Sequence, residues 1–130
     1  MKIYAIDKKS WLEVEPVKDG SYTATSVEVK IDIGHGAFSA KNIDMHFQNL
    51  GTFTSELDHF ITDRDIAPRL NGTYDSFIEI SGSVSHAFIK FCIGDEDCGA
   101  KTHQYSLCGS FEIEQEHLAP FLKIMKSIKS

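Results

Sequence analysis

The stretch Val27-Glu28-Val29-Lys30-Ile31-Asp32-Ile33 decides the fold, because aliphatic and charged residues alternate strictly along it. A period of two places the four aliphatic side chains on one face and the charged ones on the other, which is typical of a half-buried antiparallel strand. Gly34-His35-Gly36 then predicts a tight turn, and a second strand is expected over residues 37–47. The chain therefore contains a long β-hairpin with one apolar face.

The second strand of this hairpin carries an irregularity in its pattern. Its apolar positions shift phase between Phe38 and the later residues Ile43, Met45 and Phe47. One extra residue in one strand of an antiparallel pair produces such a shift, so we expect a β-bulge near Lys41. Beyond the bulge, Ile43 is expected on the apolar face.

Five further strands and two helices are expected from the remaining patterns. Each helical segment has apolar residues at spacings of three and four, which gives one apolar stripe. Pro120 is tolerated only in the first turn of the second helix. The strands are expected at residues 2–6, 10–15, 72–81, 84–94 and 103–114, and the helices at 50–64 and 117–128.

This order, ββββαβββα, predicts an α+β protein with short antiparallel connections. We expect one domain over residues 1–130, with two helices on one face of a curved sheet of about seven strands. A chain of this length buries enough surface for a core of its own.

Charge and cysteine usage limit the possible partners and compartment. The formal net charge of −6 argues against general affinity for nucleic acid or anionic membranes, because phosphate binding needs a basic surface. No apolar run reaches the roughly 20 residues that cross a bilayer. Three cysteines without a CxxC spacing predict neither a disulfide framework nor a zinc site, and Cys92 is expected to be a buried thiol. These features favour a cytoplasmic protein that binds a basic partner.

Complete catalytic and metal-binding motifs are missing from the sequence. It has no Gly-x-Ser-x-Gly motif, no glycine-rich phosphate loop and no histidine pair at helical metal spacing. The acidic segment Gly94–Gly99 lacks the alternating acids of a calcium loop, and we expect a solvated loop over residues 94–101. No catalytic residue, metal site or cofactor is predicted. A protein that works by binding is favoured over an enzyme.

Two alternatives stay open at this point. One is a general interaction module or homo-oligomer that pairs through an exposed edge strand. The other is an enzyme whose polar site assembles from residues distant in sequence, such as His86, His103 and Glu112.

The segment Gly109–Ile128, in which Phe-Glu-Ile-Glu-Gln at 111–115 is followed by Leu118, Pro120 and an apolar stripe, resembles the C-terminal signature of the WapI family of immunity proteins, and the similarity extends over most of the chain. In that family a last strand ending F-E-I-D-Q is followed by a leucine, a proline and an amphipathic helix. This sequence departs from the usual form in its acidic, cysteine-containing segment at 94–101. The matching segments are Gly109–Ile128, with Phe-Glu-Ile-Glu-Gln at 111–115, and more loosely Ile3-Tyr4, Leu12-Glu13-Val14, Leu57–Ile61, Leu70–Gly72, Phe77 and Glu79.

The resemblance implies a cytoplasmic antidote that binds and neutralises the toxic domain of a bacterial polymorphic toxin, often a nuclease. An acidic protein suits such a role, because complementary charge raises the rate of association with a basic partner. The expected contact residues are the acids of the 94–101 segment and those of the first helix. They are Asp95, Glu96, Asp97, Glu56, Asp58, Asp63 and Asp65.

Overall fold

The computed structural model of the protein describes residues 1–19, 22–98 and 102–128. Within these ranges, the side chains at 17–19, 22–24, 95–98 and 102–104 lie outside the described part of the chain. The described residues form eight strands and two α-helices, so the α+β class is confirmed. The expected single sheet of seven strands is wrong, because the strands form two antiparallel sheets of four.

The strands of each sheet follow one another in sequence, so each sheet is a simple antiparallel meander. A short 3-10 helix, η1, precedes the second α-helix. The first sheet consists of β1 (Lys2–Tyr4), β2 (Trp11–Asp19), β3 (Tyr22–Asp32) and β4 (Ala37–Met45). The second consists of β5 (Arg69–Asn71), β6 (Phe77–Gly82), β7 (Ala87–Cys98) and β8 (Thr102–Ile113). The helical elements are α1 (Leu50–Thr62), η1 (Gln115–His117) and α2 (Leu118–Ser127).

The break between the two sheets coincides with α1. This helix follows β4 and carries the chain away from the first sheet, and β5 then begins a second sheet. Two isolated bridges, Ala5 with Ile113 and Phe47 with Gly72, link the sheets. Strand β5 was not expected, since its three residues after Pro68 are too few to show an alternating pattern.

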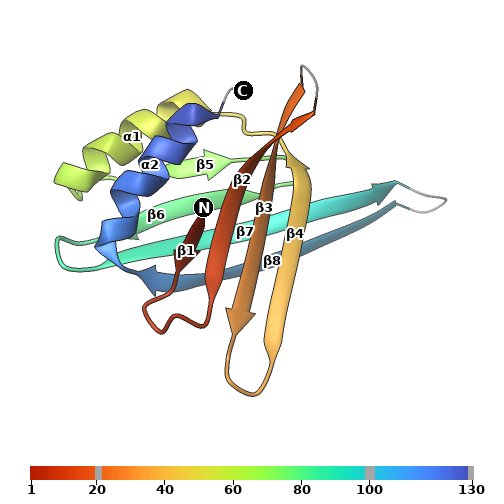
Figure 1. Cartoon of the computed structure of the whole chain (residues 1–130), viewed down its shortest axis with the longest axis horizontal. Helices are drawn as coiled ribbons and strands as arrows, with labels where there is room; N and C mark the ends of the chain where they lie inside the picture. The colour runs from red at the N-terminus through yellow and green to blue at the C-terminus, as the bar shows by residue number, and fades with distance from the viewer. Residues whose placement is uncertain (20–21, 99–101, 129–130) are drawn as a thin grey trace.

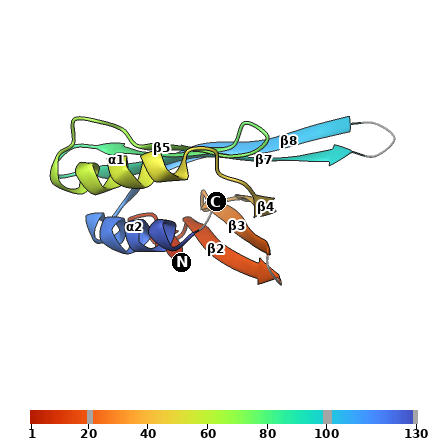
Figure 2. The ribbon, with the colours of Figure 1, turned by 90° about the horizontal axis from the view of Figure 1, so that it is seen from above.

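Both helices and the first sheet lie on the same side of the second sheet, as Figure 2 shows. The strands of the two sheets cross steeply (Figure 1), an arrangement known from orthogonal sheet packing. One apolar core joins the two sheets and both helices. Its largest fully buried side chains are Phe53, Phe60, Phe91 and Phe121.

The expected bulge is present in β4. Pairing jumps from Val27 with Asn42 to Thr25 with Met45, so β4 holds one more residue than β3 in this interval. The extra residue follows Asn42, close to the expected position. The placement of Ile43 on the apolar face is wrong: Ile43 is 68% exposed, while Asn42 and Met45 are buried.

Strands β7 and β8 form a twelve-residue ribbon that reaches well past the first sheet (Figure 1). The loop expected from Gly94 onward is therefore wrong, since the chain stays in β7 through Cys98. Residues 99–101 of that expected loop lie outside the described part of the chain. We refer to residues 95–98 and 102–105 as the arm. Acidic residues can still form a strand in the arm, because a sheet face that no other element covers needs no apolar side chains.

Candidate functional site

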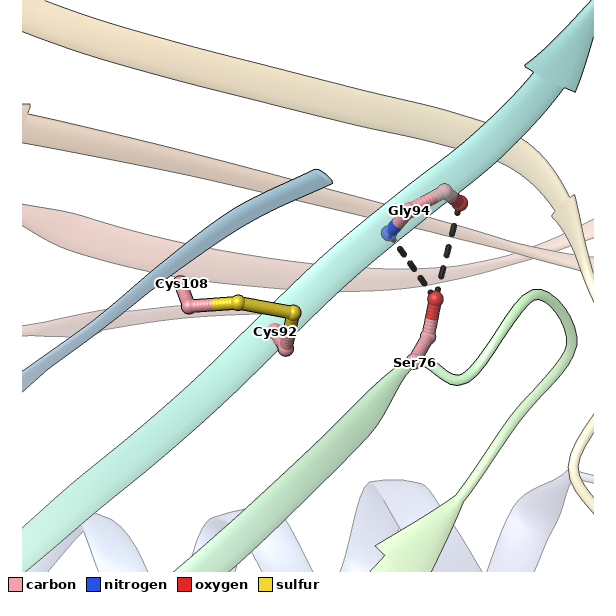
Figure 3. The surroundings of a disulfide bond; sticks show 4 residues. All are labelled: Ser76, Cys92, Gly94 and Cys108. Atoms are coloured by element: carbon pink, nitrogen blue, oxygen red, sulfur yellow. Dashed lines mark hydrogen bonds between the residues drawn. A yellow bond between two sulfur atoms is a disulfide. The ribbon is translucent and has the colours of Figure 1, made fainter. Parts of the chain in front are cut away.

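The base of the arm is held by a buried polar cluster around Gly94. Its backbone N–H donates to Ser76 Oγ over 2.9 Å, and Asn42 Nδ2 donates to the Gly94 carbonyl over 2.9 Å. The Ser76 hydroxyl lies 3.5 Å from the same carbonyl, as Figure 3 shows. These contacts join β4, the segment before β6 and β7. They therefore fix where the arm leaves the body of the protein.

Close backbone packing explains why position 94 is a glycine. A Cβ there would lie 2.9 Å from the Tyr74 carbonyl oxygen and 3.2 Å from that of Tyr105. Tyr74 and Asp75 adopt left-handed φ angles of 57° and 58°, which turn the chain onto this spot. The sequence analysis missed this cluster. Asn42, a polar residue beside a predicted apolar face, was the available signal.

Asp95, Glu96 and Asp97 are brought together in the arm as consecutive residues of β7. Their backbones pair with Tyr105, Gln104 and His103 of β8. The side chains of these three acids lie outside the described residues, so the placement rests on the backbone. The backbone alone places three acids in sequence on a projecting ribbon.

The acids predicted on α1 lie elsewhere. Figure 1 shows that α1 ends on the side of the molecule opposite the arm. Glu56 is half-buried, whereas Asp58, Asp63 and Asp65 are exposed. The structure therefore places the two sets of acids that were expected to contact the partner in different parts of the molecule.

Asp63 and Asp65 gather around His59 at the end of α1. His59 Nε2 lies 2.8 Å from Asp65 Oδ1 and 3.9 Å from Asp63 Oδ2. One nitrogen and two carboxylate oxygens fall within 4.8 Å of one another, a set that could ligate a divalent cation. All three residues are exposed, and contacts of this kind are also common between side chains on a protein surface that bind no metal. This group was not predicted, because neither the spacing of the histidines nor the acidic segment Gly94–Gly99 points to it.

The three residues of the enzyme alternative are not assembled. His86 Nδ1 lies 3.4 Å from Glu112 Oε2 at one end of the β7–β8 ribbon. His103 pairs with Asp97 in the arm, ten residues along β7 from Ala87. At about 3.3 Å per residue the two ends are roughly 33 Å apart.

Cys92 and Cys108 form a disulfide between β7 and β8 (Figure 3). The two residues are direct partners in the register, on the face of the second sheet that the helices do not cover. Cys92 is 9% exposed and Cys108 is exposed. The prediction of Cys92 as a buried thiol is therefore wrong. The signal was the spacing in sequence: Cys92 lies six residues before Cys98 and Cys108 six residues after Thr102, and Cys98 and Thr102 are themselves partners in the register.

Reduction of this disulfide is expected to lower the free energy of unfolding by about 3 kcal/mol, because it closes a loop of 16 residues. Urea denaturation with and without dithiothreitol measures the difference. The Cys108→Ser variant should match the reduced protein, and the control Cys98→Ser should keep the full response to dithiothreitol. Equal unfolding free energies of the oxidised and reduced protein would contradict this prediction.

A cavity of about 280 Å³ lies where β4 meets the base of the arm. Tyr105, one of its lining residues, is 65% exposed. Its lining residues are Ser39, Ala40, Lys41, Ile93, Gly94, Tyr105, Ser106 and Leu107.

No helix in the described part of the chain is long and apolar enough to cross a membrane. Comparison with protein-family models, curated proteins and solved structures finds no match for this chain. The resemblance to the WapI family therefore stays a prediction that rests on the quoted residues.

Proposed function

We propose that this protein acts by binding, as an immunity protein that neutralises a basic bacterial toxin domain through a direct complex. The observation that carries the proposal is the arm. It projects beyond the first sheet (Figure 1), and its β7 strand contains Asp95, Glu96 and Asp97 in sequence. A projecting acidic ribbon matches a basic substrate groove, such as that of a nuclease, in charge and in shape.

The base of the arm also suits a binding role. Buried hydrogen bonds from Ser76 and Asn42 hold Gly94 in place. Such preorganisation reduces the ordering cost of association, which otherwise offsets part of the interaction energy. The side chain of Tyr105, at the base of the arm, is 65% exposed and supplies apolar area there. An interface of standard size needs about 800 Å² from each partner.

The two acidic sets play unequal parts in this proposal. The acids around α1 lie across the molecule from the arm (Figure 1), so one interface of standard size cannot include both sets. We therefore assign the toxin contact to Asp95, Glu96 and Asp97. Glu56, Asp58, Asp63 and Asp65 contribute only to the long-range field.

The proposed compartment is the cytoplasm, where a nuclease toxin would meet its target. Glutathione and thioredoxin keep most cytoplasmic thiols reduced, so the Cys92–Cys108 bond would be open there for much of the time. Pairing along β7 and β8 does not depend on that bond, since eleven other residue pairs hold the ribbon in register. The arm therefore persists in the reduced protein.

Co-expression with a cognate toxin domain, which the proposal expects the neighbouring upstream gene to encode, tests the proposal. Cells that express the toxin domain should stop growing, and this protein should restore growth and co-purify with the domain. The matched control is a version with Asp95, Glu96 and Asp97 replaced by lysine, which should protect less well. Cells that survive the toxin domain without this protein, or die with it, would refute the function.

A further inference from the structure

The outer edge of β8 presents unused backbone hydrogen-bonding groups. Cys92 and Cys108 are opposite each other with a Cα–Cα distance of 4.0 Å, which marks the narrow type of antiparallel pair. In that type the backbone N–H and C=O groups point away from the paired strand. The same phase applies to every second residue of β8, namely Ser106, Cys108, Ser110 and Glu112.

The chain itself already uses one end of this edge. The Ile6 N–H donates to the Glu112 carbonyl over 3.0 Å, and Ala5 forms a bridge with Ile113. The chain then turns away over residues 7–9. For Ser106, Cys108 and Ser110, no described residue bonds to the outward backbone groups. The outer edge of β8 thus bonds to residues 5–6 at one end, and at Ser106, Cys108 and Ser110 it bonds to no described residue.

The β3–β4 hairpin extends past β8 and covers the space beside this edge (Figure 1). The β3 side chains on the face toward the second sheet become more exposed toward the hairpin turn, which shows where the second sheet no longer covers β3. Val29 is fully buried, Ile31 is half-buried and Ile33 is 49% exposed. Phe38, the direct partner of Ile31, is 55% exposed on the same face. The overhanging hairpin is therefore an apolar roof.

The hairpin and the open edge meet at the cavity that Ser39–Lys41 of β4 and Tyr105–Leu107 of β8 line, and we call the outer edge of β8 from this cavity to Ile6, together with the overhanging hairpin, the β8 groove. One end is bounded by Ile6, which is 48% exposed. The other end opens onto the cavity of about 280 Å³ beside Tyr105 and Ser106. Backbone donors and acceptors form one wall and aliphatic or aromatic side chains the other. This combination suits an extended peptide segment.

We propose that the β8 groove binds one extended segment of a partner protein, which becomes the fifth strand of the second sheet. Alternate residues of the segment would be apolar and face the roof, and the others would be polar or basic. The basic character follows from the net charge of −6 and from the three acids of the adjoining arm. The identity of the partner as a toxin domain rests on the proposed function; the groove itself does not.

A single segment fits this groove better than a second copy of the chain. A strand added to β8 lies about 4.8 Å away, whereas the roof reaches four residues beyond Val29, or about 13 Å. A second copy paired through its own β8 would bring its own hairpin into the same space. Two copies with net charge −6 would also repel each other.

The test uses a nine-residue peptide that alternates valine and lysine, titrated into the whole protein. We expect protection from hydrogen exchange at the amides of Ser106, Cys108 and Ser110. The Ser110→Pro variant removes one outward N–H and no bond to β7, and binding should weaken about ten-fold. The matched control Ser110→Ala keeps that N–H and should bind as the parent protein does. Phe38→Ser, which alters only the roof, should also weaken binding.

Unprotected edge amides at millimolar peptide, or equal affinities of the Ser110→Pro and Ser110→Ala variants, would overturn the inference. Hydrogen exchange of the protein mixed with the toxin domain distinguishes a failure of the groove from a failure of the proposed function. A toxin complex whose edge amides exchange freely would refute the groove as the toxin site and leave immunity intact. Peptide binding at the edge without any toxin complex would support the groove and refute immunity.

Discussion

The Phe91→Ala variant is expected to lose about 3–5 kcal/mol of unfolding free energy, the usual cost of removing a buried aromatic ring. Phe91 is fully buried at the centre of β7. Its ring centroid lies 5.9 Å from that of Phe111, and a Cβ at Gly109 would come within 3.0 Å of its Cζ. The residues around it are strand residues whose backbones cannot collapse into the space. The cavity would therefore remain and add to the lost transfer energy.

Phe88→Ala provides the matched control, because Phe88 lies on the same strand but on the uncovered face, where it is 39% exposed. Its loss of unfolding free energy should be clearly smaller than that of Phe91→Ala, since a large part of the Phe88 side chain is in contact with water in the folded protein. Chemical denaturation of both variants gives the comparison. Similar losses for the two variants would mean that the buried face of the second sheet has been assigned wrongly.

Replacement of Asp95, Glu96 and Asp97 by lysine is expected to slow association with a basic toxin domain by about 10–100-fold at low salt. The three acids follow one another on the projecting arm, so their field reaches an approaching partner first. Added salt should shrink the difference, because the Debye length falls to about 8 Å at physiological ionic strength. Stopped-flow measurement of association at several salt concentrations provides the test.

The control must change the net charge equally without touching the arm. Replacing Asp7, Glu114 and Glu116 by lysine does so at exposed positions beyond the other end of β8. That variant should slow association far less. If both triple variants slow it equally, net charge alone steers the partner and the arm has no special role.

The sequence predicted the elements that carry a regular pattern. The alternating residues 27–32 form the second half of β3, and the apolar stripes form α1 and α2. These predictions succeed because a half-buried strand or helix must repeat its apolar residues at the period of its backbone. The bulge was visible for the same reason, as a break in that period.

The division into two sheets left no comparable mark on the sequence. Each sheet is a meander of neighbouring strands, and the same strand patterns would suit one sheet or two. The burial of Asn42 depends on its bond to Gly94, 52 residues away. Contacts between elements distant in sequence depend on tertiary packing, which local patterns do not encode.

The candidate site was predicted in composition but not in geometry. The acids at 95–97 were expected in a solvated loop, and the structure extends β7 through them. The β8 groove was not expected, because it depends on how far the β3–β4 hairpin overhangs the second sheet. Neither the crossing of the sheets nor the phase of the β8 edge can be read from alternation alone.

The most direct test of the binding function is sedimentation velocity of this protein mixed with the cognate toxin domain, combined with hydrogen exchange of the mixture. The prediction is a 1:1 complex in which amides of the β7–β8 ribbon gain protection while those of α1 exchange as before. Two separately sedimenting species, with unchanged exchange along the ribbon, would contradict it.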